Sequence, residues 1–194
     1  MASANGEKVE LGFNAVRETK PKKDWVLLSL RVVAFLATAS ATLVMALNKQ
    51  TKNLVVATIG SNQITVTLTA KFQHTPAFVF FVIANGIASL HNLVMITVDI
   101  LRPQLHNKGL HLGLIAVLDM MTTALASAGD GAATFMSELG RNGNSHARWD
   151  KICDKFEAYC TRGGSALIAS FIGIILLLIV TGMSITKLLK LNRI

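Results

Sequence analysis

Arg31 is the only full charge in the apolar stretch formed by residues 26–47. An unpaired charge at membrane depth costs at least about 2.5–3.5 kcal/mol on insertion scales, so this guanidinium needs an anionic partner. Asp119, inside a second apolar stretch at residues 110–136, is the candidate. At a helical rise of 1.5 Å per residue, Arg31 lies about 8 Å and Asp119 about 14 Å from the start of its stretch. We therefore expect an intramembrane ion pair between Arg31 and Asp119.

This pair has two possible roles. In the structural interpretation, which we favour, it sets the packing and register of two helices. In the functional interpretation it belongs to an ion or proton path, which needs further titratable groups within the membrane. His91 and Asp99 are the groups that the sequence offers.

Three polar residues, Asn85, Asn92 and Asp99, follow one another at intervals of seven in the stretch 77–101. This spacing places them on one helix face. Unsatisfied polar groups cost several kcal/mol in lipid, so we expect the face to point into a helix bundle or toward another protomer. We interpret the neighbouring His91 as a structural hydrogen-bonding residue, in preference to a proton relay or a ligand.

The elements that must position these residues are membrane helices. Hydrophobic residues make up 52% of the 194 residues and charged residues 15%, and the mean hydropathy is +0.49. A bilayer core about 30 Å thick needs about 20 apolar residues per helix. Four stretches meet this requirement: 26–47, 77–101, 110–136 and 165–186. The expected fold is an all-α four-helix transmembrane bundle with both termini on one side.

The charge distribution favours cytoplasmic termini. Ten Lys and Arg residues lie on the side of the termini and eight on the other side, and the first group sits in short segments next to spans.

The net charge of +8 does not indicate nucleic-acid binding, because the basic residues flank apolar stretches and form no stripe interleaved with aromatic residues. The first stretch begins after about 25 polar residues and lacks a cleavage pattern, so it is expected to be a retained helix. Residues 1–24 are expected to be a disordered cytoplasmic tail.

The third and fourth stretches are expected to pack closely. Small residues crowd the third, and Asp119, Thr123, Ala126, Asp130 and Ala133 share one face, which is the candidate interior of the bundle. Asp130 lies near the outer end, and we expect it to reach water in preference to an intramembrane role. In the fourth stretch, the outer half carries small residues at intervals of four, whereas residues 174–180 are expected to face lipid.

The first outer loop, residues 48–76, has the pattern of a small extracellular β-hairpin. Apolar and polar residues alternate from Ile64 to Lys71 after a turn at residues 60–62. An isolated hairpin is only marginally stable in water. We therefore expect it to lean on the second outer loop or on a neighbouring protomer. Pro76 suits the first turn of the second span, and Pro103 is expected to end that span.

Both cysteines, Cys153 and Cys160, lie in the second outer loop, at about residues 137–164. An even pair in an oxidising compartment favours a disulfide. On a regular helix their Cα atoms would be roughly 10 Å apart, too far to bridge, so the chain must turn between them. Zinc is disfavoured because only His146 is near.

The chain lacks the sequence patterns of catalysis. It has no Ser-His-Asp arrangement with flanking glycines, no HExxH, no phosphate-binding glycine loop and no CxxC pair. We therefore expect no enzyme, and assign no catalytic residue, metal site or cofactor.

The layout resembles the Casparian strip membrane proteins and the CASP-like proteins of plants, over about residues 25–190. The resemblance rests on Arg31, on Asp119 in the sequence Leu118-Asp119-Met120, on residues 76–85 (PAFVFFVIAN), and on Cys153 with Cys160. It implies a plasma-membrane protein with cytoplasmic termini, a layout related to MARVEL-type four-span proteins and no known catalysis.

The resemblance also implies partners. Such proteins associate with themselves and with related four-span proteins, and founding members build a membrane platform that guides local cell-wall modification, so extracellular cell-wall enzymes are a further candidate class. Founding members carry an aromatic-rich stretch in the first outer loop, where this chain has the Thr-alternating residues 64–71. We therefore expect a general CASP-like scaffold in place of a specific barrier-forming role. The alternatives are a small channel or transporter subunit using the polar faces of the second and third helices, and a claudin-like adhesion module using the hairpin.

Overall fold

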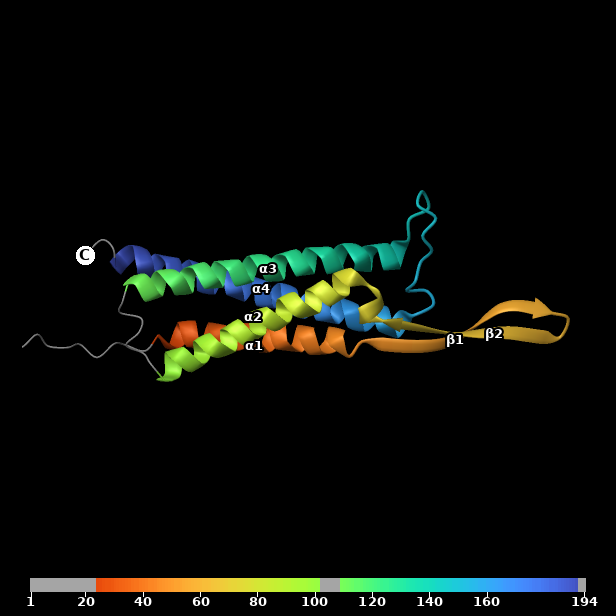
Figure 1. Cartoon of the computed structure of the whole chain (residues 1–194), viewed down its shortest axis with the longest axis horizontal. Coiled ribbons are helices and arrows are strands. Elements are labelled where there is room, and N and C mark those ends of the chain that lie inside the picture. The colour runs from red at the N-terminus through yellow and green to blue at the C-terminus, as the bar shows by residue number, and fades with distance from the viewer. Residues whose placement is uncertain (1–23, 102–108, 192–194) are drawn as a thin grey trace, which may run out of the picture.

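Four long helices form an antiparallel bundle, and a two-stranded hairpin projects from one of its ends (Figure 1). The computed structural model describes residues 24–101 and 109–191. Its elements are α1 (Trp25–Ala46), β1 (Lys49–Ile59), β2 (Asn62–Lys71), the short 3-10 helix η1 (Phe72–His74), α2 (Pro76–Leu101), α3 (Gly109–Asn142) and α4 (Glu157–Leu191). We call the end where α1 begins and α4 ends the terminal end, and the opposite one the hairpin end.

Each helix packs against two neighbours, in the cyclic order α1, α2, α3, α4, so that α1 and α3 lie diagonally across the bundle. All four helices are long and apolar enough to span a membrane. The chain is therefore a membrane protein with four candidate spans, as its hydropathy predicted. Pro76 begins α2, as expected from the preference of proline for a first helical turn.

Small residues let the four helices meet closely at the middle of the bundle. Ala34, Ala88 and Ala126, from three different helices, are completely buried and pack against Leu177 of α4. A second cluster of larger side chains, including Met45, Phe81 and Tyr159, fills the hairpin end. The predicted interior face of the third span is confirmed, because Asp119, Thr123, Ala126, Asp130 and Ala133 are all buried.

The hairpin is longer than its alternating stretch predicted. Its strands pair in antiparallel register from Lys49 with Lys71 to Ile59 with Asn62, with a bulge between Val55 and Ala57. The turn is tighter than expected, since Asn62 already belongs to β2 and Gly60 takes a positive φ of 64°. Among the hairpin side chains that the structure describes, the contacts with the bundle lie at the base, where Ala70 of β2 packs, beside Phe72 of η1, against the cluster at the hairpin end.

Two predictions, one about the limits of the second outer loop and one about the fourth span, were wrong. The second outer loop was expected at residues 137–164, but α3 continues to Asn142 and α4 already begins at Glu157. The thickness of the bilayer limits the number of apolar residues in a span. It does not limit the length of the helix, which continues beyond the bilayer into water where its residues favour helix. Residues 174–180 of α4 do not simply face lipid, because Ile174, Leu177 and Val180 are buried at helical spacing.

Some predictions concern segments outside the described residues. These are the disordered tail, except for Asp24, and the loop containing Pro103.

Candidate functional site

The predicted pair between Arg31 and Asp119 forms across the diagonal of the bundle. Arg31 Nη1 donates to Asp119 Oδ1 at 3.0 Å, and Nη2 donates to Oδ2 at 2.7 Å. The two residues are 0% and 1% exposed. Two parallel charge-assisted hydrogen bonds of this kind are the strongest arrangement open to an arginine and a carboxylate. The pair therefore joins α1 to α3 through the centre of the molecule.

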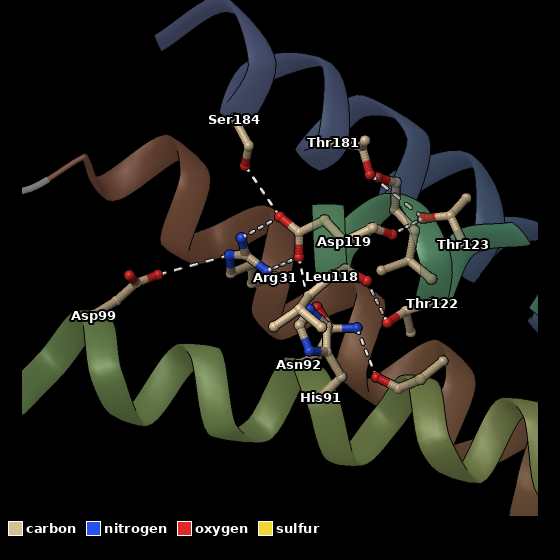
Figure 2. Close-up of polar contacts among 12 residues, drawn as sticks. Arg31, His91, Asn92, Asp99, Leu118, Asp119, Thr122, Thr123, Thr181 and Ser184 are labelled. Atoms are coloured by element: carbon tan, nitrogen blue, oxygen red, sulfur yellow. Dashed lines mark hydrogen bonds and ion pairs between the residues drawn. The ribbon is translucent and has the colours of Figure 1, made fainter. Parts of the chain in front are cut away.

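Every helix contributes to the surroundings of this pair (Figure 2). His91 Nε2 of α2 lies 2.7 Å from Asp119 Oδ1, and the Ser184 hydroxyl of α4 donates to Asp119 Oδ2 at 3.1 Å. Asp99 Oδ2, also from α2, lies 3.7 Å from Arg31 Nε. We call these five residues, Arg31, His91, Asp99, Asp119 and Ser184, the ionic network.

The network lies toward the terminal end of the bundle. Arg31 is six residues from the start of α1 and Asp119 ten from the start of α3, which is about 9 Å and 15 Å at 1.5 Å per residue. The long arginine side chain bridges this difference in depth. The network thus holds two carboxylates, one guanidinium and one imidazole within the apolar bundle, and the two partners offered by the sequence, His91 and Asp99, both belong to it.

The hydroxyl groups beside the network are satisfied by their own helix. Thr123 donates to the Asp119 carbonyl oxygen at 2.7 Å, and Thr122 donates to the Leu118 carbonyl oxygen at 2.6 Å. A hydroxyl that donates to a carbonyl oxygen of the preceding turn has its proton already used and donates no hydrogen bond to another helix. Figure 2 shows both bonds, together with Thr181 of α4 beside Thr123.

The polar face of α2 points into the bundle, as one of the two predicted alternatives required. Asn85 and Asn92 are 0% exposed, and Asp99 approaches Arg31. The amide groups of both asparagines donate to carbonyl oxygens one turn earlier, those of Phe81 and Ala88. The Nδ2 groups of both asparagines therefore bond within α2 and do not form a continuous polar lining.

A second polar cluster lies nearer the hairpin end. Ser170 of α4 donates to Asn85 Oδ1 at 2.8 Å. Asp130 of α3 lies beside Ser170 and is 1% exposed. Neither of its carboxylate oxygens has a hydrogen-bond partner among the described residues. The expectation that Asp130 reaches water was wrong, because α3 continues for three more turns beyond it and α4 covers this face.

The predicted disulfide joins Cys153 and Cys160, whose Cα atoms are 5.6 Å apart. The chain turns between them as required, because Cys153 precedes α4 and Cys160 lies in its first turn. Asn48 fixes the same region from the other side by donating to the Tyr159 carbonyl oxygen at 2.8 Å. The start of α4 is therefore held by the disulfide and by the chain that leaves α1.

Sequence reasoning missed Ser170, Ser184 and Asn48. A serine in an apolar helix is a weak signal, because its hydroxyl is commonly satisfied by its own backbone. Asn48 follows the first apolar stretch directly, a position that is usually solvated. These three residues bond to other helices because the packing of the bundle brings an acceptor from another helix within reach of each side chain.

The described residues contain no group of three or more His, Cys, Asp or Glu side chains able to hold a metal ion. With two carboxylates, an arginine and a histidine, the ionic network could stabilise the bundle or pass protons between its members.

Comparisons with known proteins converge on one family. Residues 20–176 match the model of the Casparian strip membrane protein domain. The chain is 77% identical over 194 residues to "CASP-like protein 1B1" of Glycine max, covering 100% of both chains. It is 67% identical over 189 residues to "CASP-like protein 1B1" of Populus trichocarpa, covering 97% of this chain and 96% of the relative. It is also 58% identical over 168 residues to "CASP-like protein 1B2" of Arabidopsis thaliana, covering 86% and 85%. No solved structure matches the chain.

Proposed function

The chain belongs to the Casparian strip membrane protein family, and from this premise we propose that it is an oligomerising scaffold of the plasma membrane. In this proposal both termini are cytoplasmic and the hairpin is extracellular. The protein gathers copies of itself and related four-span chains into a membrane domain that supports local cell-wall modification. The first outer loop carries a Thr-alternating strand, which favours a general CASP-like role over barrier formation.

The observation that carries the proposal is the burial of the ionic network between all four helices. Arg31 is 0% and Asp119 1% exposed, and Asp119 binds groups from α1, α2 and α4 at the same time. A charge held by so many neighbours favours one arrangement of the helices over others, which is the best-attested use of buried polar groups. This geometry suits a rigid building block.

The hairpin supplies a surface for assembly. On one face of its ribbon the apolar residues Ile64, Val66 and Leu68 are 46%, 42% and 45% exposed, and Leu54 lies opposite Val66. The other face carries a threonine ladder in which Thr51 and Thr69 bond at 3.0 Å. A two-stranded sheet is marginal alone, so in this proposal the apolar face is covered by a second copy or a related chain.

The test replaces Val66 and Leu68 together by Lys, with Thr65→Lys and Thr67→Lys as the matched control on the same strand. Both pairs add two positive charges, but only the first alters the apolar face. We expect the first pair to reduce oligomer size in mild detergent and to increase lateral mobility in the plasma membrane, while the control keeps both. Equal behaviour of the two pairs would rule out assembly through this face.

A small channel or transporter subunit remains the second candidate, and one observation favours it. His91, Asp119, Arg31 and Asp99 form a chain of titratable and charged groups linked at 2.7 to 3.7 Å. Asp99 lies two residues before the end of α2 and His91 ten residues before it. This series of charged groups thus extends from the terminal end into the bundle.

Reconstitution separates the two candidates. Purified protein in liposomes is tested for proton and cation flux, with Asp119→Asn as the comparison variant. The scaffold proposal expects no flux above that of empty liposomes. Robust flux that Asp119→Asn abolishes would overturn the scaffold proposal.

A further inference from the structure

A large cleft at the hairpin end has no role in the scaffold proposal. It has a volume of about 1050 Å³ and lies between the last turns of α3, the loop that follows them and the first half of α4. This volume lies at the upper end of the range for small-ligand sites. Nothing in the ionic network contacts it, and it therefore requires an explanation of its own.

The cleft spans the level at which the bundle leaves the membrane. Helix α1 has 22 residues, enough for one bilayer crossing, and ends at Ala46. A Cβ atom placed on Gly163 of α4 would lie 4.0 Å from Met45 and 3.6 Å from Asn48. Gly163 of α4 therefore lies at the same level as the last residues of α1. Pocket residues that follow Gly163 on α4 are thus at membrane depth, and those that precede it are beyond α1.

The two parts of the lining differ in polarity. At membrane depth the cleft is lined by Leu167, Ile168 and Phe171, of which Ile168 is 65% and Phe171 45% exposed. Beyond the end of α1 the lining carries charge. An apolar floor at membrane depth under a charged rim is complementary to an amphiphile, whose chain lies in the bilayer and whose head group lies at its surface.

The charges of the rim specify the head group. Three acidic residues, Glu138, Asp150 and Glu157, line the cleft together with one basic residue, Arg141, and we call these four the rim. Trp149, 55% exposed, lines the same part. Acidic side chains and an indole ring bind an alkylammonium group, while a guanidinium binds a phosphate. The excess of negative charge disfavours an anionic lipid.

We propose that this cleft binds one zwitterionic phospholipid from the bilayer leaflet at the hairpin end. One of its two acyl chains lies along Leu167, Ile168 and Phe171, its ammonium group faces Trp149 and the acidic rim, and its phosphate faces Arg141. The site holds the lipid as a resident molecule between α3 and α4, independently of the scaffold function.

Two glycines of α4 provide a matched pair of variants. A Cβ atom on Gly164 meets nothing within 4 Å, and Gly164 lines the cleft. A Cβ atom on Gly182 also meets nothing within 4 Å, but this residue lies on the same helix away from the cleft. Gly164→Phe places an aromatic ring in the wall of the cleft, where it competes with a bound acyl chain, and Gly182→Phe places the same side chain on the same helix away from the cleft.

The experiment reconstitutes the full chain and both variants in nanodiscs with equal amounts of phosphatidylcholine and phosphatidylglycerol, then counts the lipids retained after transfer to detergent by native mass spectrometry. We expect one retained phosphatidylcholine in the wild type and in Gly182→Phe, and its loss in Gly164→Phe. Equal retention in all three proteins, or preferential retention of phosphatidylglycerol, would overturn the proposal.

A change of oligomer size in Gly164→Phe with unchanged lipid retention would assign the cleft to a second copy of the chain and would also overturn the proposal. The double variant Asp150→Asn with Glu157→Gln is expected to keep a bound lipid but to lose the preference for phosphatidylcholine. A preference unaffected by this double variant would refute the assignment of the ammonium site.

Discussion

Removing both members of the central ion pair should destabilise the bundle by less than the sum of the two single removals. The relevant variants are Arg31→Gln, Asp119→Asn and their combination. Each single variant leaves the other charge in a site that is 0% or 1% exposed. The double variant leaves two neutral amide side chains in the same space.

The expected magnitude follows from the burial of the pair. Breaking a buried ion pair from one side costs about 3–5 kcal/mol of unfolding free energy. After Asp119→Asn, Arg31 still has Asp99 at 3.7 Å. After Arg31→Gln, both carboxylates of the network lose their guanidinium, so this variant should lie at the upper end of the range. We expect a favourable coupling energy of about 2–3 kcal/mol between the two positions.

The assay is reversible unfolding in mixed micelles by increasing sodium dodecyl sulfate, with all four proteins measured side by side. Ser40→Ala serves as a control, because Ser40 is an exposed residue of α1 that bonds only to its own helix, at the Ala37 carbonyl oxygen. Its unfolding free energy should stay within about 0.5 kcal/mol of the wild type. A double variant whose loss equals the sum of the two single losses would refute direct pairing.

Three further predictions test the packing and the covalent frame. Gly129→Ala places a Cβ atom 2.9 Å from Ala84 Cβ and 3.3 Å from Phe81 Cα, so it should cost about 1–3 kcal/mol; Gly131→Ala on the same helix meets open space and should be neutral or stabilising in thermal melts, and the reverse order would contradict this packing. Replacing Cys153 and Cys160 together by Ser opens a short loop and should cost about 2–3 kcal/mol, which reductant should reproduce in the wild type; a melting temperature insensitive to reductant would argue against the bond. Asp130→Asn removes a buried carboxylate whose oxygens have no partner among the described residues, so it should leave the unfolding free energy unchanged or raise it by about 1 kcal/mol; a loss as large as that of Asp119→Asn would show that the Asp130 charge is compensated.

Much of the fold could be predicted because its causes are local. Four apolar stretches predict four helices, and the seven-residue spacing of Asn85, Asn92 and Asp99 predicts one buried face. The helix ends could not be predicted from bilayer length. Helix α4 begins eight residues before the expected start at residue 165 because contacts of other segments hold it, including the Asn48 bond to Tyr159 and the Gln50 side chain, which accepts from the Tyr159 amide at 2.8 Å.

The candidate site divides in the same way. A lone arginine in an apolar stretch needs an acid, and Asp119 lay at a depth that the arginine side chain can reach, so this pair could be predicted from the sequence. That His91, Asp99 and Ser184 complete the network, and that Asp130 is enclosed, became visible when the four helices were placed together. The energetic cost of an unpaired charge in an apolar stretch depends on the type of residue that carries the charge. It can therefore be inferred from the sequence. Whether a hydroxyl, an imidazole or a second carboxylate shares that charge depends on which helix faces lie together, and side-chain packing across the bundle sets that arrangement.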